Sequence, residues 1–141
     1  MADALAGVLS GDPHRIWQAS WDIIGTRDKN VLEHLRLALP AIERATANIE
    51  LGGMISPNRD ALVHALDKVR NYRAWKCWCD DYRRLLAFDP TREEERGHVR
   101  VLGQSLSGWP VTYECECTVC GKEFRVDEGE HHARWWQWTP R

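Results

Sequence analysis

Apolar residues recur at helical spacing through the first two thirds of this 141-residue chain. The first stretch begins at Asp12 and Pro13, a cap followed by a residue suited to the first helical position, and it ends at Gly25. A second stripe follows Asp28, and Pro40 kinks or ends its regular part. This pattern predicts two antiparallel helices joined by a tight connection.

Two more helical stretches follow a loop over residues 49–56. Pro57, preceded by a serine, repeats the cap-and-proline start and predicts a third helix. A fourth is predicted over residues 75–86, where one face is apolar. Its members are Trp75, Trp78, Cys79, Tyr82 and Leu86. A short final turn is predicted from Pro90 to Gly97.

From His98 onward the periodicity changes to the alternation typical of strands. Over residues 111–117 apolar and acidic or polar residues alternate, and Phe124 and Val126 alternate with charged residues in the same way. We therefore expect an α+β protein, with a helical part over residues 1–97. A small antiparallel sheet of three or four strands over residues 98–141 should pack on it as one folding unit.

The strongest local signal for chemistry is Cys117-x-x-Cys120, followed by Gly121. Two cysteines three residues apart in a tight turn can converge on one Zn²⁺, and glycine permits the backbone that such a turn requires. This motif supplies half of a four-ligand site. The other ligands could come from Cys77, Cys79, Cys115, His131 or His132.

The spacing of the remaining cysteines ranks them. Cys77 and Cys79 lie about 200° apart around a regular helix, so both can reach one ion only if the helix starts between them. Cys79 shares the apolar stripe and is favoured, while Cys115 falls in the inward row of its strand and suits either a ligand or the core. We expect a structural zinc on Cys117 and Cys120, with Cys79 and Cys115 as the other candidates. Reduced thiols and a disulfide are the alternatives.

Composition excludes several classes of protein. Hydrophobic residues make up 43% and charged residues 28%, as in ordinary globular proteins, and the net charge is -2. This charge disfavours nucleic-acid binding, which relies on a cationic surface. No apolar stretch approaches the ~20 residues that span a bilayer, and the first twelve residues lack the pattern of a signal peptide. We expect a cytoplasmic protein without a membrane partner.

No motif for catalysis is present in the sequence. It contains neither a glycine-rich phosphate loop after a strand nor a nucleophile elbow, and HExxH spacing is absent. We expect a protein that is not an enzyme and has no small-molecule substrate.

An acidic row and a pair of tryptophans are the candidate partner-binding residues. Between residues 113 and 130 there are six acidic and two basic side chains. Four acids point away from the apolar face of the predicted strands: Glu114, Glu116, Glu123 and Asp127. Such a row suits a basic partner. Trp135 and Trp136 are consecutive, so in a strand they face opposite sides, and one is exposed unless another element covers it.

Residues 11–35 resemble a HEAT-type helical repeat. The matching positions, extended to the second stripe, are Asp12, Pro13, Ala19, Gly25, Asp28, Leu32, Leu35 and Leu39. The whole chain is similar to small bacterial immunity proteins of the contact-dependent and polymorphic-toxin type. The similarity lies in its tryptophan content, Asn58-Arg59, Cys77-x-Cys79 and the Tyr113-x-Cys115-x-Cys117-x-x-Cys120 element. This resemblance implies a cytosolic inhibitor that binds a cognate toxin, such as a nuclease. A zinc-knuckle module that binds nucleic acid or acts as an adaptor is the alternative.

Overall fold

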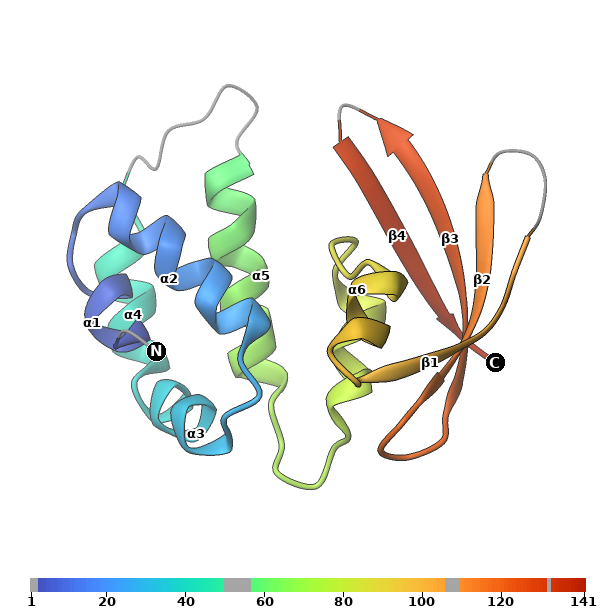
Figure 1. The fold of residues 1–141 in the computed structure, drawn as a ribbon. Helices are drawn as coiled ribbons and strands as arrows, with labels where there is room; N and C mark the ends of the chain where they lie inside the picture. Colours follow the sequence, from blue (N-terminus) through green and yellow to red (C-terminus); the bar gives the residue numbers. More distant parts are fainter. Residues whose placement is uncertain (1–2, 50–56, 106–109, 132) are drawn as a thin grey trace. The chain divides into compact units, whose positions relative to one another are not determined.

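The computed structural model describes residues 3–49, 57–105, 110–131 and 133–141, and the chain forms two compact units, Met1–Lys76 and Cys77–Arg141 (Figure 1). The first unit is helical, and the second carries a four-stranded antiparallel sheet. The predicted α+β class is confirmed. The switch from helix to strand expected at residues 97 and 98 falls inside the second unit, between Glu95 and Val99.

The first unit contains five helices among its described residues: α1 (Ala4–Val8), α2 (Pro13–Gly25), α3 (Lys29–Leu37), α4 (Leu39–Thr46) and α5 (Pro57–Asn71). The predicted caps are present. The Asp12 side chain accepts a hydrogen bond from the backbone N–H of His14, and Asp28 accepts from Asn30 and Val31. These carboxylates satisfy helix N–H groups that have no partner within the helix.

Helix α2 has α1 and α5 as its principal neighbours. The antiparallel α2–α3 pair expected from the sequence is therefore not the main packing unit, although α3 also packs on α5. At the α1–α2 crossing a Cβ on Gly7 would lie 2.7 Å from the Cβ of Ala19, so only glycine allows this approach. The core consists of buried side chains that include Ile16, Ile23, Leu32, Leu35, Ile42, Leu62 and Val69.

A buried lysine ties α5 to the end of α2. The Nζ of Lys68 donates to the carbonyl oxygens of Ile24 at 2.8 Å and Thr26 at 2.7 Å. These carbonyls lie at the C-terminal end of α2, where the helix leaves acceptors unpaired and its dipole favours a cation. Lys68 therefore closes the interface between the two helices.

We expect Lys68→Met to lower the free energy of unfolding of the first unit by roughly 2 kcal/mol, because two buried carbonyls lose their donor. Lys29→Met, at an exposed position of α3, is the matched control and should change it by less than about 0.5 kcal/mol. Urea unfolding followed by far-ultraviolet circular dichroism measures both. Equal stabilities would mean that Lys68 contributes nothing to the α2–α5 interface.

The second unit begins with a 3₁₀-helix, η1 (Trp78–Arg84), and a short helix, α6 (Pro90–Glu95). Four antiparallel strands follow in the order in which they occur in the chain: β1 (Val99–Gln104), β2 (Val111–Cys117), β3 (Glu123–His131) and β4 (Ala133–Pro140). The register places Cys115 opposite Phe124 and Val126 opposite Trp138. The residues predicted to alternate along β2 and β3 do so: one set lies on the buried face of the sheet and the other on its outer face.

Aromatic rings form the centre of the core in the second unit. The Tyr82 ring stacks on Trp138 with centroids 4.2 Å apart, and Phe124 meets both rings edge-on. The indole N–H of Trp138 donates to the Phe88 carbonyl at 2.8 Å. This cluster joins η1 and the segment after it to the buried face of the sheet.

The predicted helix over residues 75–86 is wrong in type and extent. Trp75 is 79% exposed and Leu86 is 50% exposed, and both lie outside η1. A 3₁₀-helix has three residues per turn, so Cys79 and Tyr82 lie on the same face and are buried. Residues spaced for an α-helix do not all fall on that face. Among the residues that the structure describes, no helix meets the length and hydropathy needed to cross a bilayer.

Candidate metal centre

Four cysteines of the second unit converge on one point. The Sγ atoms of Cys77, Cys79, Cys117 and Cys120 all lie within 4.8 Å of one another. Cys77 and Cys117 are separated by 3.7 Å and Cys79 and Cys120 by 3.5 Å. A tetrahedral ion with metal–sulfur bonds of about 2.3 Å places its sulfurs about 3.8 Å apart. All four are free thiols, and their arrangement is compatible with a bound metal ion.

The first two ligand positions depend on where η1 begins. Cys77 precedes the helix in an extended conformation, with φ -71° and ψ 147°, and Trp78 is the first helical residue. The helix therefore starts between Cys77 and Cys79, the condition under which both can reach one ion. The Sγ of Cys77 also accepts a hydrogen bond from the backbone N–H of Cys79, which orients the thiol.

The other two positions come from the turn between β2 and β3. The backbone N–H of Cys117 donates to the Lys122 carbonyl at 2.8 Å, and the N–H of Gly121 donates to the Cys117 carbonyl at 3.0 Å. Gly121 has a φ of 78°, a conformation that glycine adopts without strain. Thr118 fixes the turn to the start of β1, because its hydroxyl donates to the Gly97 carbonyl at 2.8 Å.

The thiols have different electrostatic environments. Burial, followed by the adjacent thiols, raises the pKa of Cys79, and burial also raises the pKa of Cys77. Burial opposes ionisation of Cys120, but the backbone N–H of Lys122 and the neighbouring thiols outweigh it and lower the pKa. Several thiolates cannot coexist at this spacing without a compensating charge, and a divalent cation supplies one.

The structure brings together three of the four expected ligands, Cys79, Cys117 and Cys120. Cys77 takes the position assigned to Cys115. Cys115 is fully buried in the sheet core, where burial raises the pKa of its thiol to about 12. It lies on the same buried face of β2 as Cys117, but two residues farther from the turn that carries Cys120, and it packs in the core opposite Phe124. His131 is exposed at the end of β3, and His132 lies outside the described residues.

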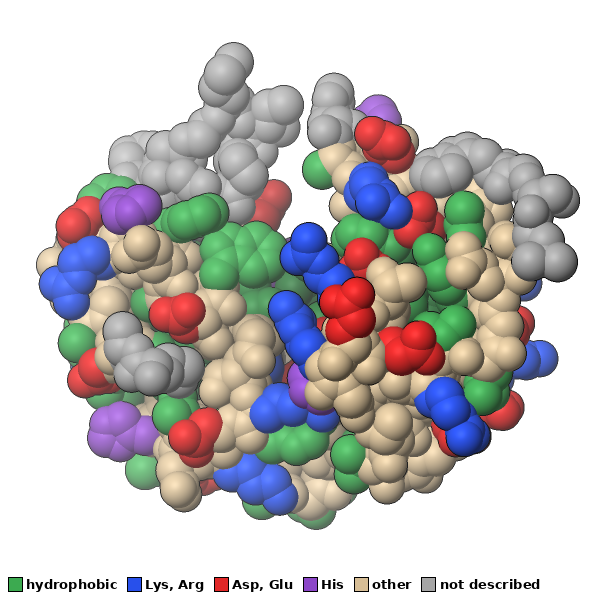
Figure 2. Space-filling view, in the orientation of Figure 1, with side chains coloured by type: hydrophobic (Ala, Val, Ile, Leu, Met, Phe, Trp, Pro, Cys, Tyr) green, Lys and Arg blue, Asp and Glu red, His purple; other side chains and the backbone are tan. Residues whose placement is uncertain are grey.

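The four expected acids of the sheet lie on its outer face, where three of them pair with arginines. Glu116 pairs with Arg100 at 2.8 Å, and Glu114 pairs with Arg141 at 2.5 Å. Asp127 pairs with Arg125 at 3.2 Å. Figure 2 shows acidic and basic side chains interspersed over the visible face of this unit. The row is therefore less negative than its local sequence suggests.

One acidic pair remains concentrated on this face. Glu116 of β2 and Glu123 of β3 are register partners, so two carboxylates stand directly opposite each other. Like charges in this position destabilise a sheet. Glu123 is exposed and has no ion pair among the residues that the structure describes. Arg100 compensates Glu116, so the uncompensated charge of the pair is that of Glu123.

Trp135 and Trp136 point to opposite sides of β4, and both are half-buried. The Trp135 ring covers Gly129, where a Cβ would lie 2.0 Å from the ring and could not be accommodated. The indole N–H of Trp136 donates to Glu128 at 2.7 Å, and the Arg134 guanidinium lies over its ring. Trp136 is thus part of the internal structure, while Trp135 lies on the outer face opposite Gly129, toward the other end of β3 from the acidic pair.

Two buried carboxylates, Glu93 and Glu128, were not among the residues predicted from the sequence. Glu128 accepts hydrogen bonds from the hydroxyl of Tyr113 at 3.2 Å, from Trp136 and from Arg134. Burial and this carboxylate raise the pKa of Tyr113 to about 12. Glu93 contacts His98 and Tyr82. Glu128 falls on the inward face in the alternation of β3, and that position is the sequence feature that could have predicted its burial.

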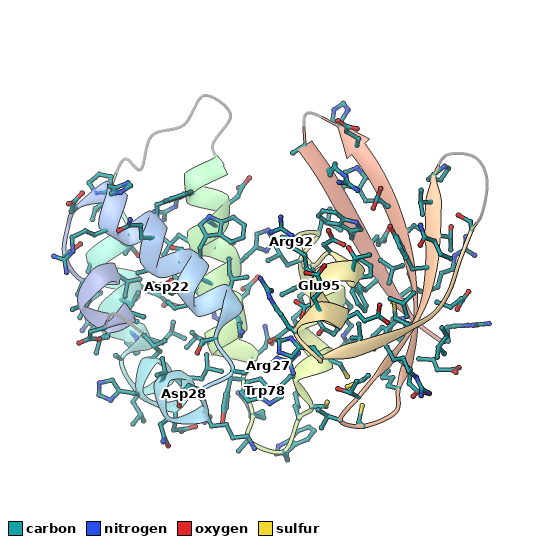
Figure 3. All side chains as sticks on the ribbon, in the orientation of Figure 1. Asp22, Arg27, Asp28, Trp78, Arg92 and Glu95 are labelled. Atoms are coloured by element: carbon teal, nitrogen blue, oxygen red, sulfur yellow. The ribbon has the colours of Figure 1, made fainter. Side chains whose placement is uncertain are left out.

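Glu93 is buried on a short helix whose other charged side chains are exposed. Its neighbours Arg92 and Glu95 are exposed on the same short helix (Figure 3). The Glu93 side chain instead bonds to His98, with its oxygen 2.5 Å from Nδ1. Glu93 and Glu128 therefore hold structural hydrogen bonds within the unit.

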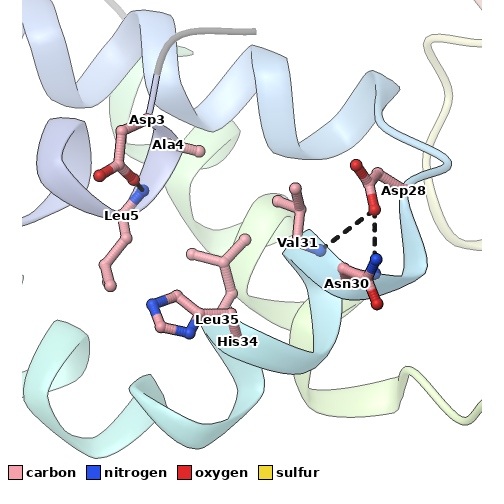
Figure 4. Close-up of a pocket in the computed structure, with 8 residues that line it drawn as sticks. All are labelled: Asp3, Ala4, Leu5, Asp28, Asn30, Val31, His34 and Leu35. Carbon is pink, nitrogen blue, oxygen red and sulfur yellow. Dashed lines mark hydrogen bonds between the residues drawn. The ribbon is translucent and has the colours of Figure 1, made fainter.

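A pocket of about 470 Å³ lies in the first unit and is bordered by α1 and α3 (Figure 4). Both carboxylates at its edge are used as helix caps. Asp3 accepts from the backbone N–H of Leu5 at 3.0 Å, and Asp28 accepts from Asn30 at 2.9 Å. His34 and Leu35 complete this side of the pocket. The polar groups are explained by capping, so the pocket supplies no separate catalytic pair.

No protein-family model, curated protein or solved structure matches the chain. Function is therefore inferred from the geometry and charge of its two units.

Proposed function

We propose that the chain is a non-catalytic immunity protein that neutralises a cognate bacterial toxin by stoichiometric binding. Its second unit is held together by a structural Zn²⁺. The observation that carries the proposal is the convergence of four thiols from two segments of this unit. Four cysteine ligands complete a tetrahedral zinc site and leave no position for a reacting water. Such a centre supports a binding surface and has no place for a substrate.

Zinc is the metal that this donor set favours. Thiolates are soft ligands, and tetrahedral four-sulfur sites in proteins hold zinc or iron. The Cys-x-Cys and Cys-x-x-Cys-Gly segments converge as a zinc knuckle requires. Elemental analysis of the purified protein distinguishes the two metals, and we expect close to one zinc per chain.

The charge of the second unit supports a basic partner. Cys77–Arg141 contains twelve acidic and nine basic side chains, whereas Met1–Lys76 contains nine acidic and ten basic ones. Four thiolates around one Zn²⁺ would add two further negative charges. Together with the opposed Glu116 and Glu123, this charge would steer a basic surface, such as the phosphate-binding face of a nuclease toxin, toward the unit.

The decisive experiment titrates a toxin encoded beside this gene with the zinc-loaded chain. Toxin activity should fall linearly and reach its end point at one equivalent, because a binding inhibitor is consumed as it acts. Neutralisation by a small fraction of an equivalent would show turnover and reject the proposal. Salt-dependent binding to nucleic acid without toxin inhibition would favour the knuckle-module alternative.

Charge reversal tests which surface binds. Glu116→Lys combined with Glu123→Lys should slow association with the toxin about tenfold and weaken its dependence on salt. The control is Glu33→Lys, an exposed reversal on α3 of the first unit, which should leave association unchanged. Stopped-flow association rates at two ionic strengths measure both variants. Equal slowing by both would place the binding surface elsewhere.

A further inference from the structure

The four sulfurs of the centre form two close pairs that each bridge the same two segments. Cys79 and Cys120 are 3.5 Å apart, and Cys77 and Cys117 are 3.7 Å apart. One member of each pair belongs to the start of η1 and the other to the β2–β3 turn. Disulfide bonds are about 2.05 Å long, so each pair would have to close by roughly 1.5 Å.

Access to solvent differs sharply within the group. Cys120 is exposed, whereas Cys79 and Cys117 are each only 3% exposed. Val119, the residue before Cys120, is 67% exposed, so the turn is open at this point. A small oxidant can therefore reach Cys120 first, and the sulfur of the buried Cys79 lies 3.5 Å from that of Cys120.

We propose that this centre is a peroxide-sensitive switch, in which oxidation joins Cys120 to Cys79 as a disulfide and expels the metal. The switch rests on the proposed zinc only for the release step. The pairing of the sulfurs is a property of the fold.

The chemistry balances with one hydroperoxide for each disulfide. The Cys120 sulfur attacks the peroxide oxygen, the O–O bond breaks, and the leaving oxygen departs as water or an alcohol after protonation. Cys120 is then a sulfenic acid. The Cys79 sulfur attacks the Cys120 sulfur, the S–O bond breaks, and the hydroxide takes up a proton to leave as water. Two thiols lose two electrons and the peroxide gains them.

The metal is lost because half of its ligands have been removed. Only the Cys77 and Cys117 thiolates remain, and a second peroxide would close this pair by the same steps. Each disulfide joins the η1 segment to the β2–β3 turn, as the metal did. Oxidation should therefore release zinc without unfolding the second unit.

The test treats the zinc-loaded full chain with hydrogen peroxide in the presence of a colorimetric zinc chelator. Free thiols, counted after denaturation, should fall from five to three as about one zinc is released per chain. Peptide mapping without reduction should recover a Cys79–Cys120 link at this stage. Circular dichroism should retain the strand signal, and dithiothreitol with added zinc should restore all five thiols.

Controls separate this switch from the proposed metal. Zinc content of the purified chain before oxidation tests the metal, and peptide mapping of the same purified chain after peroxide tests the pairing of the sulfurs separately. Cys115→Ala removes the cysteine outside the group and should release zinc at the same rate as the wild type. A first link between Cys117 and Cys120, a link through Cys115, or zinc retention until Cys120 becomes sulfinic acid would overturn the proposal.

Discussion

Cys77→Ser should remove zinc from the chain and unfold the second unit as completely as Cys117→Ser does. The two sulfurs lie 3.7 Å apart in one group, so each would supply a quarter of the coordination shell of the proposed zinc. Structural zinc contributes on the order of 10 kcal/mol to folding, which is comparable with the total stability of a small domain. The sequence alone ranks Cys77 below Cys79 and predicts a smaller effect for its replacement than for that of Cys117.

Cys115→Ser is the matched control because it makes the same chemical change in the same strand as Cys117. It places a hydroxyl in an apolar core and should lower the free energy of unfolding by about 1–3 kcal/mol. The proposed zinc should still be bound. Zinc content by mass spectrometry and thermal unfolding by circular dichroism give the comparison. The assignment of the ligands would be refuted if Cys77→Ser kept its zinc while Cys115→Ser lost it.

The fold could largely be predicted from local pattern. Aspartate before proline at residues 12 and 13 marks the start of α2, and the alternation over residues 111–117 marks the buried face of β2. Each of these signals depends only on residues that are close together in the sequence. The stretch around Cys79 could not be predicted in this way, because apolar spacing at helical intervals does not distinguish a long α-helix from the short 3₁₀-helix that forms.

The candidate site was predicted where its ligands are neighbours and missed where they depend on a helix boundary. Cys117 and Cys120 share one turn, so their spacing was sufficient. Cys77 is a ligand candidate only because η1 begins at Trp78, which the composition of that stretch does not indicate. The charge of the outer sheet face was overestimated for a related reason: Arg100 and Arg141 reach it from other parts of the chain.

The buried carboxylate of Glu128 decides how the two adjacent tryptophans differ in role. It accepts hydrogen bonds from Tyr113 and Trp136, which are covered by the core, and from the exposed guanidinium of Arg134. The ion pair with Arg134 contributes little, because solvent screens the exposed partner. If the carboxylate were removed, the Tyr113 hydroxyl and the Trp136 indole N–H would lose their hydrogen-bond acceptor.

Glu128→Ala should therefore lower the free energy of unfolding of the second unit by roughly 3 kcal/mol, because two shielded donors lose their acceptor. Glu128→Gln keeps an acceptor oxygen and should cost about half as much, while Glu130→Ala, at an exposed position of β3, should cost less than about 0.5 kcal/mol. Urea unfolding of the zinc-loaded variants, followed by tryptophan fluorescence, measures the series. Trp136→Phe should likewise lower the free energy of unfolding, whereas Trp135→Ala should speed dissociation from the proposed toxin partner. If Glu128→Ala were as stable as Glu130→Ala, Glu128 would not be holding the indole, and Trp136 would be available as a partner anchor.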